Sequence, residues 1–345
     1  MHVLAATSVG AAHALELDQG LLGAAGLMVL WNLFREKDEL VVLGIGLFAA
    51  VASGIVSVAL LSQQSISVFL GAFTVDGFTH LFRLIGAGTA ILVLLSAARE
   101  STIPAGRRAE YYALILVAAT AIQILAGASE LMTVFVALEL LSITSFVLVG
   151  FSKENVRSSE AALKFFLFGV ASIGVLLYGF SILFGMAGTT ELAPLAREFV
   201  ARSMSPLVWV AFMLVPAGFG FKILMAPFHM WGPDVYEGAG TPVTTFLAIG
   251  SKAAGFAVLL RVLLTVFGSQ MTEWVVLVGI LSALTMTIGN VLALGQKNIK
   301  RMLAYSSIAH GGYLLVGMAG GSSALRIPGL LYYLLGYVFV TGGAF

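Results

Sequence analysis

Long apolar runs separated by short polar links follow one another from residue 17 to the end of the chain. Each run holds about 20 residues, the length that an α-helix needs to cross a hydrocarbon layer of about 30 Å. No strand pattern rises above the helical one, and no stretch reads as a soluble domain. The sequence therefore predicts an all-α, polytopic transmembrane bundle of eleven helices, over residues 17–34, 40–62, 76–98, 110–128, 131–151, 160–187, 207–229, 242–267, 273–295, 302–320 and 325–345.

Composition supports a membrane protein and excludes several other classes. Hydrophobic residues make up 59% of the chain and charged residues 10%, whereas soluble domains carry about 25% charged residues. A net charge of +1 argues against a nucleic-acid surface. The chain has no cysteine, and its histidines form no pair at i+3 or i+4, so we expect no metal, haem or iron–sulfur cofactor in it.

The distribution of Lys and Arg among the links predicts the orientation. The links after the odd-numbered helices hold ten of these residues, whereas the N-terminus and the even-numbered links hold three. Because cytoplasmic loops are the richer in Lys and Arg, the N-terminus is predicted to lie outside. Residues 1–16 lack the basic start of a signal peptide and are interpreted as a retained amphiphilic segment at the membrane interface.

Two lysines lie deep in the predicted helices 207–229 and 242–267. Lys252 follows about ten residues into its helix, about 15 Å deep at 1.5 Å per residue. A charge near the bilayer centre costs at least about 2.5–3.5 kcal/mol. A carboxylate that approaches or leaves a buried lysine changes its affinity for a proton, so Lys222 and Lys252 predict proton or ion transfer. The alternative is a static buried ion pair.

Two further charged residues are candidates for the same chemistry. Glu139 lies about eight residues into helix 131–151, close to mid-membrane. It is either a functional acid or a carboxylate satisfied by Ser142 or Thr144. Lys164 either takes part in proton transfer or extends to the interface and pairs with Glu160 at i−4.

The segment around Lys222 has the pattern of a broken helix. Pro216 and Pro227 flank the lysine, and proline is tolerated at membrane depth only where protein or water meets the freed carbonyls. His229 follows seven residues after Lys222 and is expected on roughly the same helix face. His229 and His310 are either proton relays or, respectively, an interfacial residue and a hydrogen-bonded helix contact.

Asp76 and Arg83 stand at i and i+7 in the predicted helix 76–98. We interpret them as a structural pair, and the alternative is a contact with another subunit.

Two segments carry a resemblance to a known family. They read KILMAPFHMWGPDVYEGAGTPVTTFLAIGSKAAGFAVLLR (222–261) and IGNVLALGQKNIKRMLAYSSIAHGGYLLVG (288–317). Both resemble subunit N of the proton-pumping NADH–quinone oxidoreductase, respiratory complex I. The resemblance implies an antiporter-like bundle of fourteen helices with two inverted five-helix repeats, of which this chain holds about eleven helices. It divides the chain into 1–109, a first repeat at 110–267 and the start of a second at 273–345, as if the chain were truncated at its C-terminus.

The resemblance also implies roles for residues of this chain. Glu139 matches the glutamate that pairs with the lysine Lys222, and Lys252 matches the connecting lysine of the next helix. Lys164, His229 and His310 match further members of a polar proton-transfer path. The helix 12 lysine that ends the family's path has no counterpart here.

The expected function is proton translocation across the inner (plasma) membrane, coupled to electron transfer from NADH to quinone. NADH, FMN, iron–sulfur clusters and quinone would bind to other subunits. The expected partners are K-, J- and M-like membrane-arm subunits and lipid, without nucleic acid or a soluble small-molecule ligand. The alternatives are a subunit of an Mrp-type cation/proton antiporter or of a membrane-bound hydrogenase, or a structural membrane subunit that has lost pumping.

Overall fold

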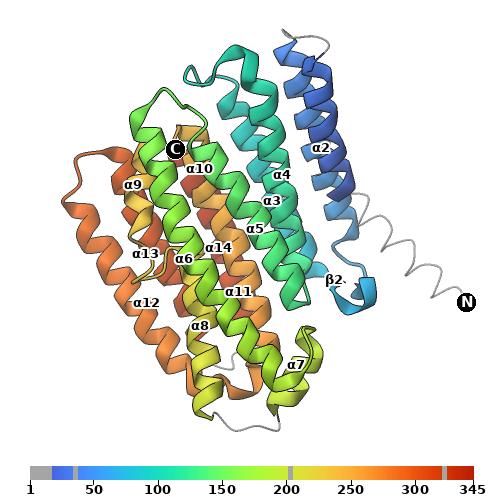
Figure 1. The fold of residues 1–345 in the computed structure, drawn as a ribbon, viewed down its shortest axis with the longest axis vertical. Helices are drawn as coiled ribbons and strands as arrows, with labels where there is room; N and C mark the ends of the chain where they lie inside the picture. Colours follow the sequence, from blue (N-terminus) through green and yellow to red (C-terminus); the bar gives the residue numbers. More distant parts are fainter. Residues whose placement is uncertain (1–17, 34–37, 201–204, 321–324) are drawn as a thin grey trace, which may run out of the picture.

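The computed structural model describes residues 18–33, 38–200, 205–320 and 325–345. The predicted amphiphilic segment 1–16 lies outside these residues. Long helices run roughly side by side along the longest axis of the molecule (Figure 1). Residues 18–33 are helical, and the later helices are α2 (Glu39–Leu60), α3 (Gly77–Ala97), α4 (Arg108–Gly127), α5 (Leu131–Val149), α6 (Val156–Ala187), α7 (Leu192–Val200), α8 (Pro206–Ile223), α9 (Trp231–Gly238), α10 (Thr241–Phe246), α11 (Lys252–Val266), α12 (Met271–Leu294), α13 (Ile299–Ala319) and α14 (Arg326–Ala344).

The structure confirms the predicted all-α class. Within the described residues, nine helices are long and apolar enough to cross a membrane. The predicted helix 207–229 is wrong in its length, because α8 ends at Ile223. The amphipathic α7 was not predicted, since its nine residues are too short to stand out as a spanning run.

A small β-hairpin is the second element that the sequence did not reveal. Strands β1 (Ile66–Val68) and β2 (Phe73–Val75) pair antiparallel. Gly71 in the turn has a φ of 96°, a conformation that glycine adopts without strain. The Phe73 ring occupies the space that a side chain at Gly127 would need, which seats the hairpin against the end of α4. Strands of three residues are too short to produce a visible alternation in the sequence.

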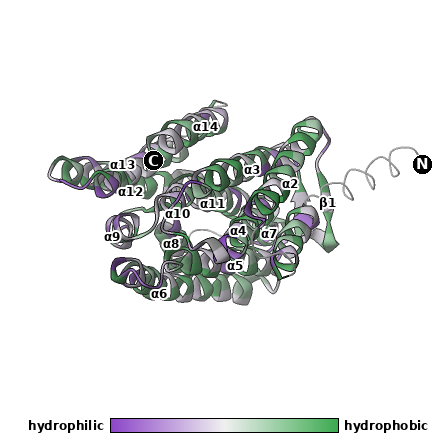
Figure 2. Cartoon of the chain, turned by 90° about the horizontal axis from the view of Figure 1, so that it is seen from above, coloured by the Kyte–Doolittle hydropathy of each residue, from purple (hydrophilic) through white to green (hydrophobic). Residues whose placement is uncertain are grey.

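The most enclosed element is the interrupted helix formed by α10, a π-helical turn at Leu247–Ser251 and α11. In its most apolar stretch 89% of the residues are buried, against 22–28% for α2, α6 and α12. Figure 2 shows α10 and α11 near the middle of the bundle, with α2 and β1 towards one side and α12 and α13 towards the other. Lys252, on this element, is therefore shielded from both lipid and water.

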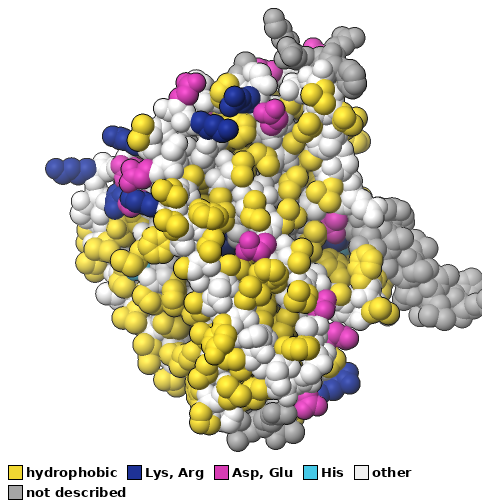
Figure 3. Space-filling model, viewed as in Figure 1, with side chains coloured by type: hydrophobic (Ala, Val, Ile, Leu, Met, Phe, Trp, Pro, Cys, Tyr) yellow, Lys and Arg dark blue, Asp and Glu magenta, His cyan; other side chains and the backbone are white. Residues whose placement is uncertain are grey.

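The surface divides into an apolar flank and two polar ends. Figure 3 shows hydrophobic side chains over much of the visible flank, with most charged side chains towards the ends. One surface pocket joins the links after α3, α5 and α9 to the start of α13, through Glu100, Ser152, Gly240 and Lys300. Another joins the hairpin to the links after α4 and α6. The links thus alternate between the two ends, as expected of a multi-pass membrane protein.

The predicted pair between Asp76 and Arg83 is not formed. Two helical turns separate them by about 10 Å along the axis. Asp76 caps α3 by accepting a hydrogen bond from the Thr79 backbone N–H (2.7 Å), and it pairs with Arg261 of α11 at 3.0 Å. Arg83 is fully buried and pairs with Asp18 at 2.7 Å. Each ion therefore links α3 to another helix.

Candidate functional site

The helix that carries Lys222 stops one residue after it. Leu224 takes a left-handed conformation with a φ of 60°. The polar groups freed by the break find partners nearby: the Ala226 N–H donates to Thr285 Oγ1 of α12 at 3.0 Å, and Trp231 Nε1 donates to the Phe221 carbonyl at 3.0 Å. The predicted broken helix is confirmed, with its backbone satisfied by surrounding protein.

Lys222 points into the protein interior with only 3% of its surface exposed. Its Nζ donates a hydrogen bond of 3.2 Å to Ser142 Oγ of α5 and lies 6.0 Å from the centre of the Phe165 ring of α6. Gly255 of α11 allows close packing here, because a side chain at that position would lie 3.3 Å from Lys222 Cβ. The lysine is therefore held between α5, α6 and α11.

Glu139 lies one turn before Ser142 on α5 and is half-buried. Its charge interacts with that of Lys222, although within the described residues the two side chains form no direct ion pair. Ser142 donates to the Leu138 carbonyl and Thr144 to the Leu140 carbonyl, so neither hydroxyl satisfies Glu139. Glu139 therefore lies close enough to interact with Lys222 by charge without contacting it.

Lys252 begins α11 directly after the π-helical turn and is 1% exposed. Its Nζ donates to both the carbonyl and the hydroxyl of Ser307 on α13. It also lies 5.3 Å from the centre of the Tyr337 ring of α14. Within the described part of the chain, no carboxylate pairs with this ammonium. Neutral dipoles and an aromatic face therefore surround the second lysine.

His310 lies one turn after Ser307 on α13. Its Nδ1 hydrogen-bonds to the Tyr333 hydroxyl at 2.6 Å, and its ring lies 5.1 Å from the Tyr337 ring. Lys252 and His310 influence each other electrostatically. The structure therefore brings the second lysine and this histidine into one cluster.

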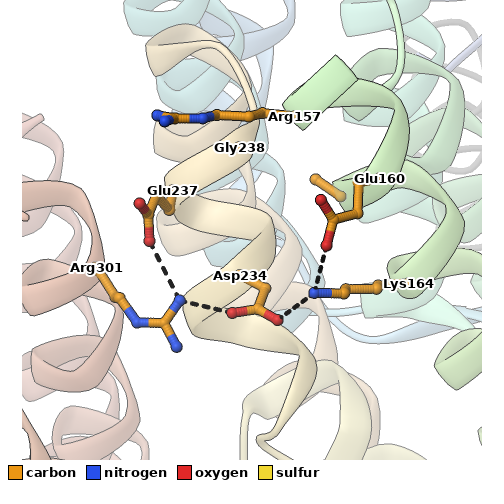
Figure 4. Close-up of a pocket in the computed structure, with 8 residues that line it drawn as sticks. Arg157, Glu160, Lys164, Asp234, Glu237, Gly238 and Arg301 are labelled. Carbon is orange, nitrogen blue, oxygen red and sulfur yellow. Dashed lines mark hydrogen bonds and ion pairs between the residues drawn. The ribbon is translucent and has the colours of Figure 1, made fainter. Parts of the chain in front are cut away.

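Lys164 lies in an ion network at a polar end of the bundle. Its Nζ contacts Glu160 at 2.8 Å and Asp234 of α9 at 2.7 Å (Figure 4). Arg301 of α13 in turn contacts Asp234 at 2.6 Å and Glu237 at 3.2 Å. With 40% of its side chain exposed, Lys164 forms the predicted pair with Glu160 and is not enclosed with Lys222.

Asp234 is the centre of this network and lies in α9, outside the nine spanning helices. Burial raises the pKa of Asp234, but the hydrogen bonds and charges of Lys164 and Arg301 outweigh that effect and hold the pKa below its usual range. The network therefore ties α9 to α6 and α13 by charge.

His229 lies in the segment between α8 and α9. The expectation that it shares a helix face with Lys222 is wrong, because the helix ends before it. Its Nδ1 is buried and has no hydrogen-bond partner among the described residues. The structure therefore does not connect His229 to either lysine.

No group of three or more His, Cys, Asp or Glu side chains in the described ranges is arranged to hold a metal ion. The polar groups near the lysines are buried hydroxyls, the partly buried imidazole of His310 and the half-buried carboxylate of Glu139. Such a set can hold and pass protons, and it offers no grouped ligands for a metal.

Comparisons with known proteins place these features in a family. A profile described as "NADH:quinone oxidoreductase/Mrp antiporter, TM" matches residues 128–345. NADH-quinone oxidoreductase subunit N of Trichlorobacter lovleyi is 42% identical over 333 residues, which cover 96% of this chain and 68% of that protein. The chain belongs to the NADH:quinone oxidoreductase/Mrp antiporter membrane family.

Two further relatives agree with that assignment. Subunit N of Desulforamulus reducens is also 42% identical, over 88% of this chain and 64% of its own length. A chain of respiratory complex I from Thermus thermophilus superimposes with a TM-score of 0.79 at 32% identity, covering 94% of this chain and 68% of that one. The chain thus spans about two thirds of the length of these family members.

The sequence of this family member did not reveal several residues of the two buried-lysine sites and of the Lys164 ion network. Ser307 and Tyr337 stand out only once α13 and α14 are packed against α11. Asp234 and Arg301 are 67 residues apart, so their ion pair has no local signal in the sequence. Ser142 was considered as a partner of Glu139 and is instead a partner of Lys222.

Proposed function

We propose that this chain is a membrane-arm subunit of NADH–quinone oxidoreductase that translocates protons, coupled to electron transfer from NADH to quinone. The names of its relatives and the family assignment support this function. The observation that carries it is the pair of fully buried lysines on either side of the broken helix. Burying an ammonium group is costly, and charged side chains inside a membrane usually mark a transfer path. Two buried lysines in neighbouring helical segments therefore favour proton transfer.

The path begins at Lys222 in this proposal. When the Glu139 carboxylate moves closer, the ammonium form of Lys222 is stabilised, and when it withdraws, the lysine releases its proton toward Lys252. His310 follows Lys252 through the cluster of Ser307 and the two tyrosines. Lys164 and His229 stay proposed members of the path, although neither contacts a buried lysine.

The magnitudes are compatible with this step. A thousandfold change in the proton affinity of Lys222 corresponds to about 4 kcal/mol. Moving one charge across a membrane requires about 2.3 kcal/mol per 100 mV, so this change matches about 180 mV. One carboxylate movement can therefore supply the work of one proton transfer.

The remaining parts of the assignment are likewise proposals. The chain divides into residues 1–109, a first repeat at 110–267 and the start of a second at 273–345. It sits in the inner (plasma) membrane with the N-terminus outside, and its partners are K-, J- and M-like subunits. The redox cofactors NADH, FMN, iron–sulfur clusters and quinone belong to other subunits.

The test is Lys222→Met in the assembled enzyme, measured as proton pumping per NADH oxidised in membrane vesicles. We expect pumping by this variant to fall more than about tenfold, because the titratable group is lost while an apolar side chain fills its space. Lys297→Met is the matched control, since Lys297 is exposed in the link after α12. Full pumping and turnover in the Lys222 variant contradict the proposal.

A subunit of an Mrp-type antiporter or of a membrane-bound hydrogenase is the second candidate. The family profile is described by both the oxidoreductase and the Mrp antiporter, and the lysine path itself needs no redox group in this chain. Purification from native membranes separates the candidates. Co-purifying quinone-site and iron–sulfur subunits support the oxidoreductase, whereas a complex made only of antiporter subunits supports the alternative.

A further inference from the structure

A directed series of hydrogen bonds starts at Lys252 and crosses three helices. The Tyr337 hydroxyl donates to the Ala248 carbonyl at 3.0 Å. A tyrosine has one hydroxyl proton, so in the 2.8 Å contact between Ser307 and Tyr337 the serine is the donor. The lone pairs of Ser307 Oγ are thereby left to accept from Lys252. Each bond fixes the direction of the next.

The series ends on a backbone carbonyl in the π-helical turn. Ala248 lies within Leu247–Ser251, the turn that directly precedes Lys252. A π turn lengthens the hydrogen-bond spacing of a helix, and such turns are frequent at functional sites. Tyr337 therefore bonds to the same turn that positions Lys252. It also orients the Ser307 hydroxyl, whose oxygen accepts a hydrogen bond from the Lys252 ammonium.

We propose that Ser307 and Tyr337 are positioning residues that stabilise the protonated form of Lys252 and so set the pH range in which it carries protons. This inference rests on the proposed function and adds two residues to it. Tyr337 acts twice: its ring faces the ammonium at 5.3 Å, and its hydroxyl aligns Ser307. No carboxylate among the described residues takes over this task.

The other titratable groups near Lys252 come from three elements. His310 of α13 interacts with it electrostatically, and the Lys222 stem of α8 packs against Gly255, one turn after Lys252. Tyr236 of α9 is fully buried, and its hydroxyl lies near Ser307. None of these groups supplies a negative charge to Lys252, so Ser307 and the Tyr337 ring provide its stabilisation.

The experiment replaces the hydroxyl and keeps the ring. Tyr337→Phe is assembled into the complete enzyme, and proton pumping per NADH oxidised is measured in vesicles from about pH 6 to pH 9. Without the aligned serine the ammonium loses stabilisation, so Lys252 binds its proton only at a higher proton concentration. We expect the alkaline limit of pumping to move about one pH unit downward, a tenfold change in proton affinity.

Companion variants separate positioning from structure. Ser307→Ala is expected to shift the pH profile in the same direction, and Ser307→Thr to restore it because threonine retains the hydroxyl. Tyr332→Phe on the same helix is the control, since Tyr332 is 82% exposed. Unchanged profiles in both Tyr337→Phe and Ser307→Ala overturn the inference.

Lys252→Met distinguishes the two levels of the argument. If Lys252→Met pumps normally, the proposed function of the lysine path fails. If Lys252→Met does not pump and the two hydroxyl variants keep the parent profile, only the positioning role fails.

Discussion

Lys222 and Lys252 are equally buried, but they are stabilised by different partners. Lys222 has a hydroxyl at 3.2 Å and a carboxylate, Glu139, on the same neighbouring helix. Lys252 has a serine carbonyl, a hydroxyl and an aromatic ring, and no carboxylate within the described ranges. The first lysine responds to the position of a charge, whereas the second responds to the orientation of dipoles.

This difference affects how each site is controlled. The interaction of two charges extends over several ångströms in a medium of low dielectric constant, so Glu139 can act without contact. A hydrogen bond weakens steeply once its angle is lost, so Ser307 acts only when aligned. The Lys222 site is therefore suited to receiving a signal from a distance, and the Lys252 site to holding a proton until its neighbours rotate.

The largest predicted effect comes from removing the charge that distinguishes the two sites. Glu139→Gln keeps the shape of the side chain and eliminates its negative charge, so Lys222 loses its switch. We expect proton pumping per NADH to fall about tenfold or more, which corresponds to at least about 1.4 kcal/mol. The measurement is the rate of proton uptake in vesicles at matched NADH oxidation.

Glu110→Gln provides the control for that experiment, because Glu110 is exposed in the first turn of α4. If Glu139→Gln pumps as well as Glu110→Gln, the contrast between the lysines is wrong, and Lys222 works through dipoles alone.

A smaller effect is expected from Ser142→Ala. This change removes the hydrogen bond to the Lys222 ammonium but leaves Glu139 in place. Hydrogen bonds to charged groups contribute about 1.5–3 kcal/mol in general, and the remaining carboxylate offsets part of that loss. We expect pumping to decrease about threefold. A loss as large as that in Glu139→Gln would show that the serine, rather than the carboxylate, controls the site.

The smallest effect is expected in the ion network that links α9 to α6 and α13. Because the pKa of Asp234 is lower in the folded protein than in the unfolded chain, its contribution to stability is present above the unfolded value, about 3.9. That contribution is lost as the pH falls through the folded value. We expect the thermal unfolding temperature to decrease below about pH 4, and to decrease less in Asp234→Asn.

The measurement is thermal unfolding in detergent between about pH 3 and pH 7. Asp38→Asn serves as the control, because the Asp38 side chain makes no capping hydrogen bond to α2. If the unfolding temperature depends on pH identically in Asp234→Asn and its parent, the ion network does not stabilise the position of α9.

The sequence predicted the helices well because their length and apolarity are local properties. Residues 131–151 were expected to be helical, and α5 spans Leu131–Val149. The end of α8 was missed because Leu224 adopts its conformation together with a contact between Ala226 and Thr285, 59 residues apart. Whether the helix continues past Leu224 depends on its contact with α12, and the local sequence carries no signal of that contact.

The candidate site shows the same division. Lys222 and Lys252 were recognised because a charge in an apolar run is conspicuous. Ser307 and Tyr337 were not, because a serine or tyrosine in a membrane helix is common and only the packing of α11, α13 and α14 gives these two their partners. The spacing of Asp76 and Arg83 suggested a pair, yet both residues bond to other helices.

A glycine of α13 packs against the helix break that follows Lys222. Gly311 of α13 lies so close that a methyl group there would be 3.0 Å from the Ile223 carbonyl and 4.0 Å from Lys252 Nζ. The absence of a side chain at Gly311 thus allows α13 to pack against both the end of the first lysine's helix and the amine of the second lysine. An alanine at this position would press on the carbonyl that ends the first lysine's helix and would also contact the second lysine's amine.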